Sequence, residues 1–240
     1  MKNRIKAVVL GLSLLASVSV CYAQDFDKGL VAYDSGDYAT ALREWRPLAD
    51  QGDAIAQYNL GLMYSKGEGV TQDDKEAARL WELAADQGYA FAQNNLGLMY
   101  DIGQGVTQDD KEAARLFGLA AAQGDADAQL NLGVMYNNGQ GVTQDYKEAV
   151  RLYGLAAAQG KASAQYNLGN MYFRGEGVTQ DNVYAHMWWN IVASSGDADA
   201  VKNRDIVAGK MTAADISKAQ DLARECVKKE YKGANLALAL

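Results

Sequence analysis

The chain has 240 residues, with 23 Lys and Arg against 30 Asp and Glu and a formal net charge of −7. No basic patch stands out along the sequence, which argues against a nucleic-acid partner. After the N-terminal segment there is no run of about 18 apolar residues, so the sequence predicts no membrane span in the mature form.

The N-terminal segment has the layout of a secretory signal peptide. A basic start at residues 2–6 precedes an apolar stretch at residues 7–20 that is too short to span a bilayer, and a small-residue site ends at Ala23. We expect cleavage after Ala23, so that residues 1–23 are lost and the protein is periplasmic or secreted. The alternative is a lipoprotein acylated at Cys21, although Val20 stands where a small residue is expected. Cleavage would leave 20 basic against 30 acidic residues, a charge of about −10.

Residues 24–53 predict a shortened helix pair. Trp45 lies 36 residues before Trp81, the interval that governs the rest of the chain, whereas Tyr33 and Tyr64 are only 31 residues apart. This difference indicates that five loop residues are missing. We interpret the segment as an N-terminal capping repeat, because a solenoid needs divergent ends to cover its apolar faces.

Residues 54–199 contain four copies of one unit. The loop that begins GEGVTQDD at Gly67 returns at Gly103, Gly139 and Gly175, always after 36 residues. Each loop follows a first helix of the type AQYNLGLMY, as at residues 56–64, and precedes a second helix. Constant spacing of this length predicts stacked helix–turn–helix repeats and an all-α solenoid.

Local chemistry predicts the ends of these helices. Asp73 and Glu76 form a capping-box-like pair, in which each side chain can accept an amide hydrogen at the start of the second helix. Gly88 suits the left-handed residue that closes this helix after Gln87. Gly61 falls inside the first helix, where glycine costs about 1 kcal/mol against alanine, so we expect close helix–helix approach there. The repeats supply counterparts at Asp109/Glu112 and Asp145/Glu148, at Gly124, Gly160 and Gly196, and at Gly97, Gly133 and Gly169; Asp53, Asp125 and Asp197 are expected to cap the first helices.

The glycine loop is a poor candidate for a phosphate site. A phosphate-binding loop follows a strand and carries Gly-Lys-Ser/Thr, whereas a helix precedes this loop and Asp73 and Asp74 would repel phosphate. Metal chemistry is also disfavoured, because His186 is the only histidine and no calcium loop motif occurs. We therefore predict no catalytic residues, no metal site and no cofactor.

The C-terminal segment, residues 200–240, predicts capping helices. A further first helix begins around residues 199–208, and a long amphipathic helix runs from Thr212 to about Tyr231. Cys226 shares helical spacing with apolar residues and is expected to be a buried thiol, with a reactive thiol as the alternative. His186, which stands beside Trp188 and Trp189, is expected to pack at the junction with this cap.

Together these residues resemble a known family. The A-x-x-x-L-G-x-x-Y first helix, the G-x-G-V loop, the E-A-x-x-x-x-x-x-A-A second helix and the closing Q-G resemble the Sel-one-like repeat, a relative of the tetratricopeptide repeat. The resemblance implies a right-handed superhelix of helix pairs and a role as a secreted or periplasmic interaction scaffold. Some cysteine-rich relatives are described as β-lactamases or penicillin binders. This chain lacks their cysteine pairs, and none of its serines has Lys three residues later.

Comparison of the four units indicates where a partner could bind. On a helical wheel, the constant positions of the first helix cover one face and the changing positions lie opposite, rich in aromatic, aliphatic and amide side chains. In tetratricopeptide-like solenoids the first helices line the concave side, so this varied face would form a groove. The predicted groove residues are Tyr58, Phe91, Leu130, Tyr166 and Phe173, together with the unchanging amides Asn59, Asn95, Asn131 and Asn167. Contact between adjacent repeats is the competing role for the former, and bonding across neighbouring units for the latter.

The sequence therefore predicts an exported, non-enzymatic scaffold that binds a protein or peptide through its concave helix face. The partner could be an envelope protein, such as a cell-wall enzyme, or a host protein. The alternative is a hydrolase of the β-lactamase or penicillin-binding type, which would rest on fold analogy alone.

Overall fold

The computed structural model describes residues 26–229 and 231. The leader, with both of its interpretations, and residues 232–240 lie outside this part of the chain. Between residues 26 and 229 every regular element is a helix, which confirms the predicted all-α class. The chain divides into two compact units, Met1–Gln108 and Asp109–Leu240, called here the N-terminal and C-terminal units.

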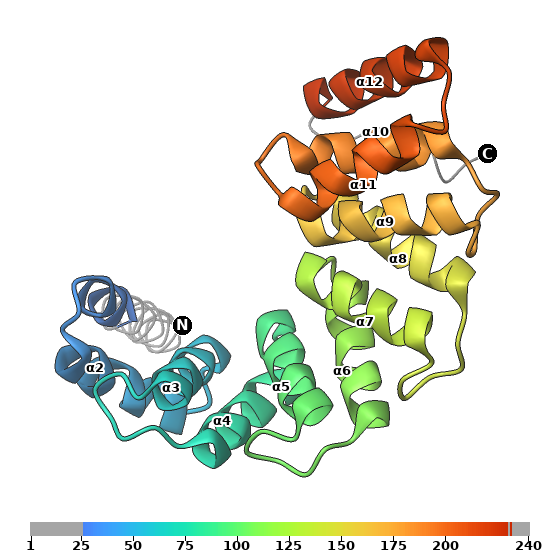
Figure 1. Ribbon diagram of the computed structural model, residues 1–240. Helices are drawn as coiled ribbons and strands as arrows, with labels where there is room; N and C mark the ends of the chain where they lie inside the picture. Colours follow the sequence, from blue (N-terminus) through green and yellow to red (C-terminus); the bar gives the residue numbers. More distant parts are fainter. Residues whose placement is uncertain (1–25, 230, 232–240) are drawn as a thin grey trace, which may run out of the picture. The chain divides into compact units, whose positions relative to one another are not determined.

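The helices alternate as the repeat predicts (Figure 1). Residues 26–34 are helical and precede the first labelled helix. First helices are α3 (Ala54–Lys66), α5 (Ala90–Ile102), α7 (Ala126–Asn138), α9 (Ala162–Arg174) and α11 (Ala198–Ala208); second helices are α2 (Tyr38–Asp50), α4 (Asp74–Asp86), α6 (Asp110–Ala122), α8 (Tyr146–Ala158) and α10 (Asn182–Ala193); α12 (Ala213–Lys228) comes last. Consecutive helices pack together from α2 to α5 and from α6 to α11, and α12 packs on α10, as in a repeat solenoid.

Glycines inside the first helices admit large side chains from the second helices. A Cβ atom added at Gly61 would lie 2.4 Å from Trp81 Nε1, and one added at Gly169 would lie 2.5 Å from Trp189 Nε1. Tyr153 fills the same place against Gly133. The predicted close helix–helix approach is confirmed at these positions, and the ring on the second helix is its cause.

The two loop glycines have different tasks. Gly103 ends α5 in the left-handed conformation, at φ 70°, and Gly105 also has a positive φ of 71°. A Cβ atom added at Gly105 would lie 2.3 Å from the carbonyl oxygen of Asp74, at the start of the preceding second helix. Gly141 and Gly177 meet Asp110 and Tyr146 in the same way. The loop is therefore a hinge and also a contact between adjacent repeats, which confirms the structural interpretation and adds to it.

Only one of the two hydrogen bonds of the predicted capping box is present. Asp73 accepts hydrogen bonds from the amides of Lys75 and Glu76, as expected. The Glu76 carboxylate does not return the bond, because the Asp73 amide already donates to the carbonyl of Tyr64 at 3.0 Å. Glu76 instead accepts two hydrogen bonds from Arg79. Glu112 with Arg115 and Glu148 with Arg151 repeat this arrangement, so the prediction that the Glu side chain accepts from the capping residue's amide was wrong at all three pairs.

The predicted caps of the first helices at Asp53, Asp125 and Asp197 are confirmed.

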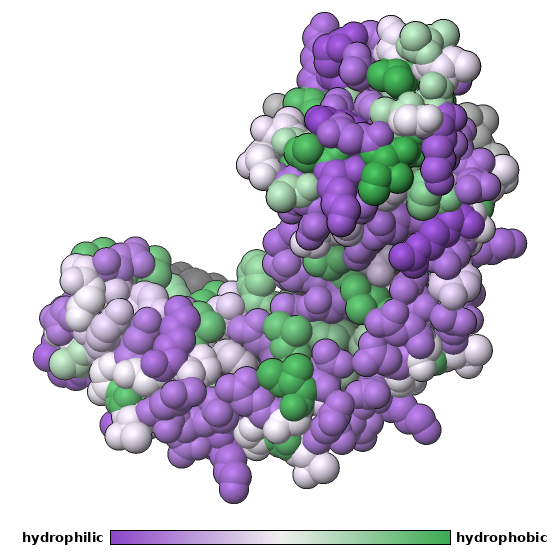
Figure 2. All heavy atoms as spheres, in the orientation of Figure 1, coloured by the Kyte–Doolittle hydropathy of each residue, from purple (hydrophilic) through white to green (hydrophobic). Residues whose placement is uncertain are grey.

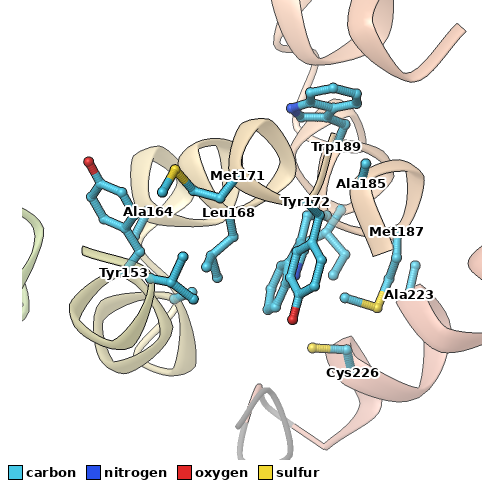
Figure 3. Close-up of a cluster of buried hydrophobic side chains, with 14 of the residues drawn as sticks. Tyr153, Ala164, Leu168, Met171, Tyr172, Ala185, Met187, Trp189, Ala223 and Cys226 are labelled. Atoms are coloured by element: carbon cyan, nitrogen blue, oxygen red, sulfur yellow. The ribbon is translucent and has the colours of Figure 1, made fainter. Parts of the chain in front are cut away.

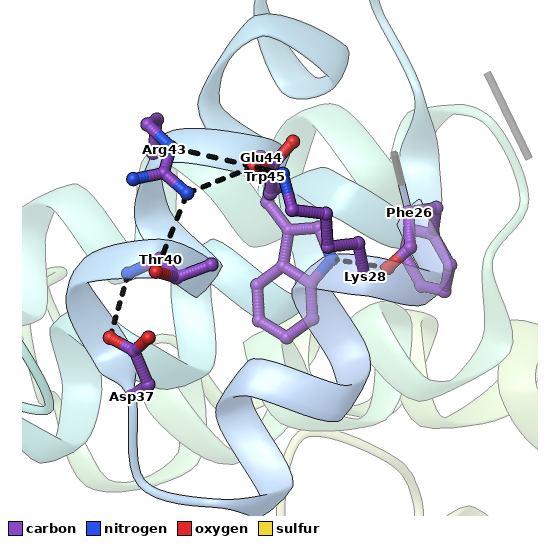
Figure 4. A network of polar contacts seen from close by, with 7 residues as sticks. All are labelled: Phe26, Lys28, Asp37, Thr40, Arg43, Glu44 and Trp45. Carbon is purple, nitrogen blue, oxygen red and sulfur yellow. Dashed lines mark hydrogen bonds and ion pairs between the residues drawn. The ribbon is translucent and has the colours of Figure 1, made fainter. Parts of the chain in front are cut away.

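The N-terminal cap aligns with the repeats differently from the sequence prediction. Trp45 donates to the carbonyl of Phe26 at 3.2 Å (Figure 4) and packs over Gly29. In the same way, Trp81 donates to the carbonyl of Tyr58 and packs over Gly61. Phe26 and Gly29 therefore occupy the places of Tyr58 and Gly61, 32 residues later. Four loop residues are missing rather than five, and Ala32, not Tyr33, matches Tyr64.

The largest buried cluster lies in the C-terminal unit. Trp188 and Trp189 of α10 are 0% and 2% exposed and pack with residues of α9 and α12 (Figure 3). Cys226 of α12 points into this cluster, and burial raises the pKa of its thiol above the ordinary value. His186 is 2% exposed. The predictions of a buried thiol and a packed histidine are confirmed.

Candidate interaction surface

Tyr58 belongs to a group of aromatic rings on the varied face of the N-terminal unit. Its ring centroid lies 5.1 Å from that of Tyr89 and 6.1 Å from that of Phe91, and the Tyr89 and Phe91 centroids are 5.6 Å apart. Trp81 supports Tyr58 from behind, with its centroid 6.5 Å away. We call Tyr58, Tyr89 and Phe91 the aromatic patch. The structure thus brings together two predicted groove residues from different repeats.

The aromatic patch is preorganised but only partly covered. Phe91 remains 54% exposed although it stands beside two rings, and Tyr58 and Tyr89 are half-buried. Burial raises the pKa of the Tyr89 hydroxyl above its ordinary value. Edge-to-face ring packing restricts side-chain rotation, which lowers the entropic cost of binding another apolar group.

The predicted groove residues of the C-terminal unit have other neighbours. Tyr166 accepts a hydrogen bond of 2.8 Å from Asn203 of α11, and Phe173 lies under the ammonium of Lys210, 4.8 Å from its ring centroid. Phe173 also packs on Trp189, with centroids 5.5 Å apart. Leu130 is half-buried against the same unit's core. These side chains serve contacts between adjacent repeats as well as any binding role.

The members of the asparagine column also differ in their hydrogen-bond partners. Asn59 donates to the carbonyl of Ile55 on its own helix at 2.9 Å. Asn167 is hydrogen-bonded to Tyr153 of the preceding repeat. Asn95 and Asn131 are half-buried on α5 and α7. Asn203 follows Asn167 by 36 residues and is the next member of the column, a position that the sequence analysis missed although the interval would have found it.

A second amide column, buried in the stack, has a structural role. Gln57 is 4% exposed and donates to the carbonyl of Ala49, at the end of the preceding second helix. Gln87 in turn donates to the Gln57 side chain at 2.8 Å. Gln93, Gln129 and Gln165 make the same bond to the preceding repeat. These buried donors satisfy carbonyls at helix ends, where water is excluded.

Tyr89 was also missed as a candidate. It stands in the column of first-helix caps, Asp53, Asp125 and Asp197, and makes no side-chain capping bond. An aromatic residue in a column of aspartates was a signal in the sequence that could have identified Tyr89 as a candidate.

The described residues contain no group of three or more His, Cys, Asp or Glu side chains that could hold a metal ion. No helix among them is long and apolar enough to cross a membrane.

The repeats match a known family model. The Sel1 repeat model covers residues 54–89, 90–125, 126–161 and 162–197. The chain belongs to the Sel1 repeat family. Proteins of this family are commonly interaction scaffolds that bind other proteins, and are generally not enzymes. No curated protein matches the sequence.

Solved structures are similar over most of the chain. The protective antigen c5321 of uropathogenic Escherichia coli, which displays an SLR fold, is 32% identical with a TM-score of 0.81 over 89% of this chain and 47% of the antigen, so this chain spans about half the antigen's length. A Sel1 repeat protein from Oxalobacter formigenes is 30% identical with a TM-score of 0.71, over 85% of this chain and 84% of that protein. A putative Sel1 repeat protein from Klebsiella pneumoniae, 23% identical with a TM-score of 0.51 over 78% and 93% of the two chains, shows a similar fold.

Proposed function

We propose that this Sel1 repeat protein is an exported scaffold that binds a protein or peptide through the varied face of its first helices and catalyses no reaction. The observation that carries the proposal is the exposure of the aromatic patch, where Phe91 presents more than half of its surface to solvent. An apolar ring group in a stable stack adds affinity when a partner covers it, and aromatic anchors contribute much of the energy of interfaces.

Export is proposed from the leader at residues 1–23 and places the partner in the periplasm or outside the cell. One structural relative is described as a protective antigen, a description that fits an exported protein. The partner would be an envelope protein, such as a cell-wall enzyme, or a host protein. The hydrolase alternative receives no support from the family or from the relatives.

The test is site-specific photo-crosslinking in the native cell. A photoreactive phenylalanine analogue at position 91 should capture a protein partner that mass spectrometry identifies, and Tyr58→Ala should reduce capture by at least about tenfold, as expected for loss of an interface anchor. The matched control places the analogue at Ser163, the exposed equivalent of Phe91 in α9. Equal capture from both positions would show that the aromatic patch is not the binding surface.

A second measurement addresses the enzyme alternative. The purified chain should give no turnover of a chromogenic β-lactam above the rate in buffer. Turnover that a single point mutation abolishes would refute the scaffold proposal.

A further inference from the structure

The repeat geometry does not require apolar side chains at the aromatic patch. Positions 55 and 89, at the two ends of one repeat, hold Ile and Tyr, whereas the equivalent positions 127 and 161, separated by the same 34 residues, hold Asp and Lys. Asp127 and Lys161 form an ion pair of 2.7 Å on the surface of the C-terminal unit. The repeat fold therefore tolerates a polar pair at these two positions. Stability of the stack alone does not explain why the N-terminal unit has apolar residues there.

Tyr89 also replaces a stabilising residue. Asp53, Asp125 and Asp197 each accept a hydrogen bond from a first-turn amide of the helix that follows, and Tyr89 makes no such bond for α5. Loss of a capping side chain costs about 0.5–2 kcal/mol. At Lys161, where this bond is also lost, an ion pair is formed in exchange. At Tyr89, contacts of its ring with the rings of Tyr58 and Phe91 take the place of the capping bond.

The apolar residues of the N-terminal unit continue beyond the aromatic patch. Ile55, the equivalent of Phe91 in the preceding repeat, is 43% exposed. In the view of Figure 2, hydrophobic atoms also reach the surface over α5, whose Leu98 and Ile102 are 38% and 62% exposed. Of the five large hydrophobic side chains that are exposed on the first helices α3, α5, α7, α9 and α11, four belong to this unit, and Ile206 is the fifth. Such a concentration is typical of a docking surface.

Charge selects the chemistry of the partner. Residues 26–108 carry 13 acidic and 6 basic side chains, a net charge of −7, whereas residues 109–240 carry 16 and 14, a net charge of −2. Exposed Asp50 and Asp86 end the second helices just before Ile55 and Phe91. None of the ion pairs among the described residues uses either carboxylate, although Asp50 also attracts the Arg79 guanidinium. The equivalent residues of the C-terminal unit are Ala122 and Ala158. At these helix ends, therefore, a carboxylate precedes an exposed apolar residue in the N-terminal unit, whereas alanine precedes Asp127 and Ser163 in the C-terminal unit.

We infer that the aromatic patch binds a segment of a partner protein in which a bulky apolar side chain is flanked by Lys or Arg. The apolar side chain would pack on Phe91 and Ile55, and the flanking cations would face Asp86 and Asp50. This inference rests on the proposed function and specifies its ligand. Complementary charge at the rim accelerates association and rejects acidic segments, and its contribution weakens with salt.

The experiment uses three synthetic peptides of equal length and the full chain expressed with its own leader and labelled with ¹⁵N. In the first peptide Phe and Leu alternate with Lys; in the second Glu replaces Lys; in the third Ser replaces Phe and Leu. NMR titration should show that the first peptide shifts the amide signals around Phe91 and binds about tenfold more tightly than the second. The third peptide should not shift them. Raised salt should remove most of the difference between the first two.

Two variants separate the contributions. Ile55→Asp with Tyr89→Lys copies the ion pair of the C-terminal unit, keeps the net charge, and should abolish binding while the helical circular dichroism stays unchanged. Asp50→Asn with Asp86→Asn should bring the affinity for the Lys peptide close to that for the Glu peptide.

Each other outcome has a definite meaning. Equal binding of the Lys and Glu peptides would overturn the charge selection and leave the aromatic patch as a peptide site. Absence of binding to all three peptides, with a partner still crosslinked at position 91, would refute the inferred ligand and retain the proposed function. Signals around Phe91 that move with protein concentration alone would mean that a second copy of the chain covers the patch, and would also overturn the inference.

Discussion

Equivalent residues on the varied face of the first helices have different surroundings in the two units of this chain. In the N-terminal unit, Tyr58 meets the rings of Tyr89 and Phe91, and the group remains open to solvent at Phe91. In the C-terminal unit, Tyr166 meets the amide of Asn203, and Phe173 is covered by Lys210. Equivalent first helices of 13 residues therefore carry different chemistry on this face. Binding chemistry can therefore be placed in one part of a solenoid while another part is closed by its cap.

The largest expected change in the free energy of unfolding comes from replacing a buried aromatic residue, and a similar replacement of an exposed one should have little effect. Trp188→Ala should lower the free energy of unfolding by about 3–5 kcal/mol, because the indole is fully buried in the cluster of α9, α10 and α12. Phe91→Ser, which copies the residue at position 163, should change it by less than about 1 kcal/mol. Urea denaturation followed by circular dichroism measures both. A Phe91 variant as unstable as the Trp188 variant would make the aromatic patch part of the core.

The glycines of the helices provide a second test, in which two identical substitutions should have opposite signs. Gly169→Ala should destabilise the chain by about 1–3 kcal/mol, because the new methyl group would overlap Trp189. Gly118→Ala should stabilise it by up to about 1 kcal/mol, because its Cβ atom meets nothing within 4 Å and alanine favours the helix. Thermal melting of the two variants side by side decides the matter. Equal shifts would mean that close approach does not limit the stack.

A smaller effect is expected at the polar contact that closes the C-terminal unit. Tyr166→Phe should lower the free energy of unfolding by about 0.5–1.5 kcal/mol, since it removes the acceptor of the Asn203 hydrogen bond. Asn203→Ala should cost a similar amount, and the double variant should cost less than the sum of the two single ones. Additive losses in denaturant titrations would show that the two side chains do not interact energetically.

The smallest effect concerns pH and is confined to the C-terminal unit, which holds the single histidine. Burial, and to a lesser extent Arg204, lowers the pKa of His186 below its ordinary value of 6.5, while Asp205 opposes the shift. The unfolded chain therefore binds the proton more tightly. Stability contributed by the neutral side chain is complete above about pH 6.5 and declines as the pH falls below it. Thermal melts between pH 7.5 and 5.5 should show this decline in the wild type. They should not show it in His186→Val, which carries the residue of the equivalent position 150. The same decline in both proteins would assign it to other groups.

Much of the fold follows from the sequence because the signals are local and repeated. The interval of 36 residues, the Asp caps and the glycines that follow the helices of the repeats depend on backbone conformation within a few residues, so the order of the helices was predicted correctly. The buried Cys226 and the packed His186 were also predicted correctly. The family is equally a property of the repeated motif. The sequence also indicated that the constant face builds the stack and that the varied face includes Tyr58 and Phe91.

Other features depend on contacts between separate helices and loops, and only the tertiary structure decided them. Glu76 pairs with Arg79 because the loop folds back, so that the carbonyl of Tyr64, nine residues earlier, already accepts the Asp73 amide. The shortened first repeat aligns by the contact of Trp45 with Gly29, which no local pattern specifies. Tyr89 joins Tyr58 and Phe91 because the turn before α5 brings the end of one repeat and the start of the next beside the first helix α3. Local backbone preferences therefore determined the helices and their order, whereas side-chain packing between repeats determined which of the varied residues form an open aromatic surface.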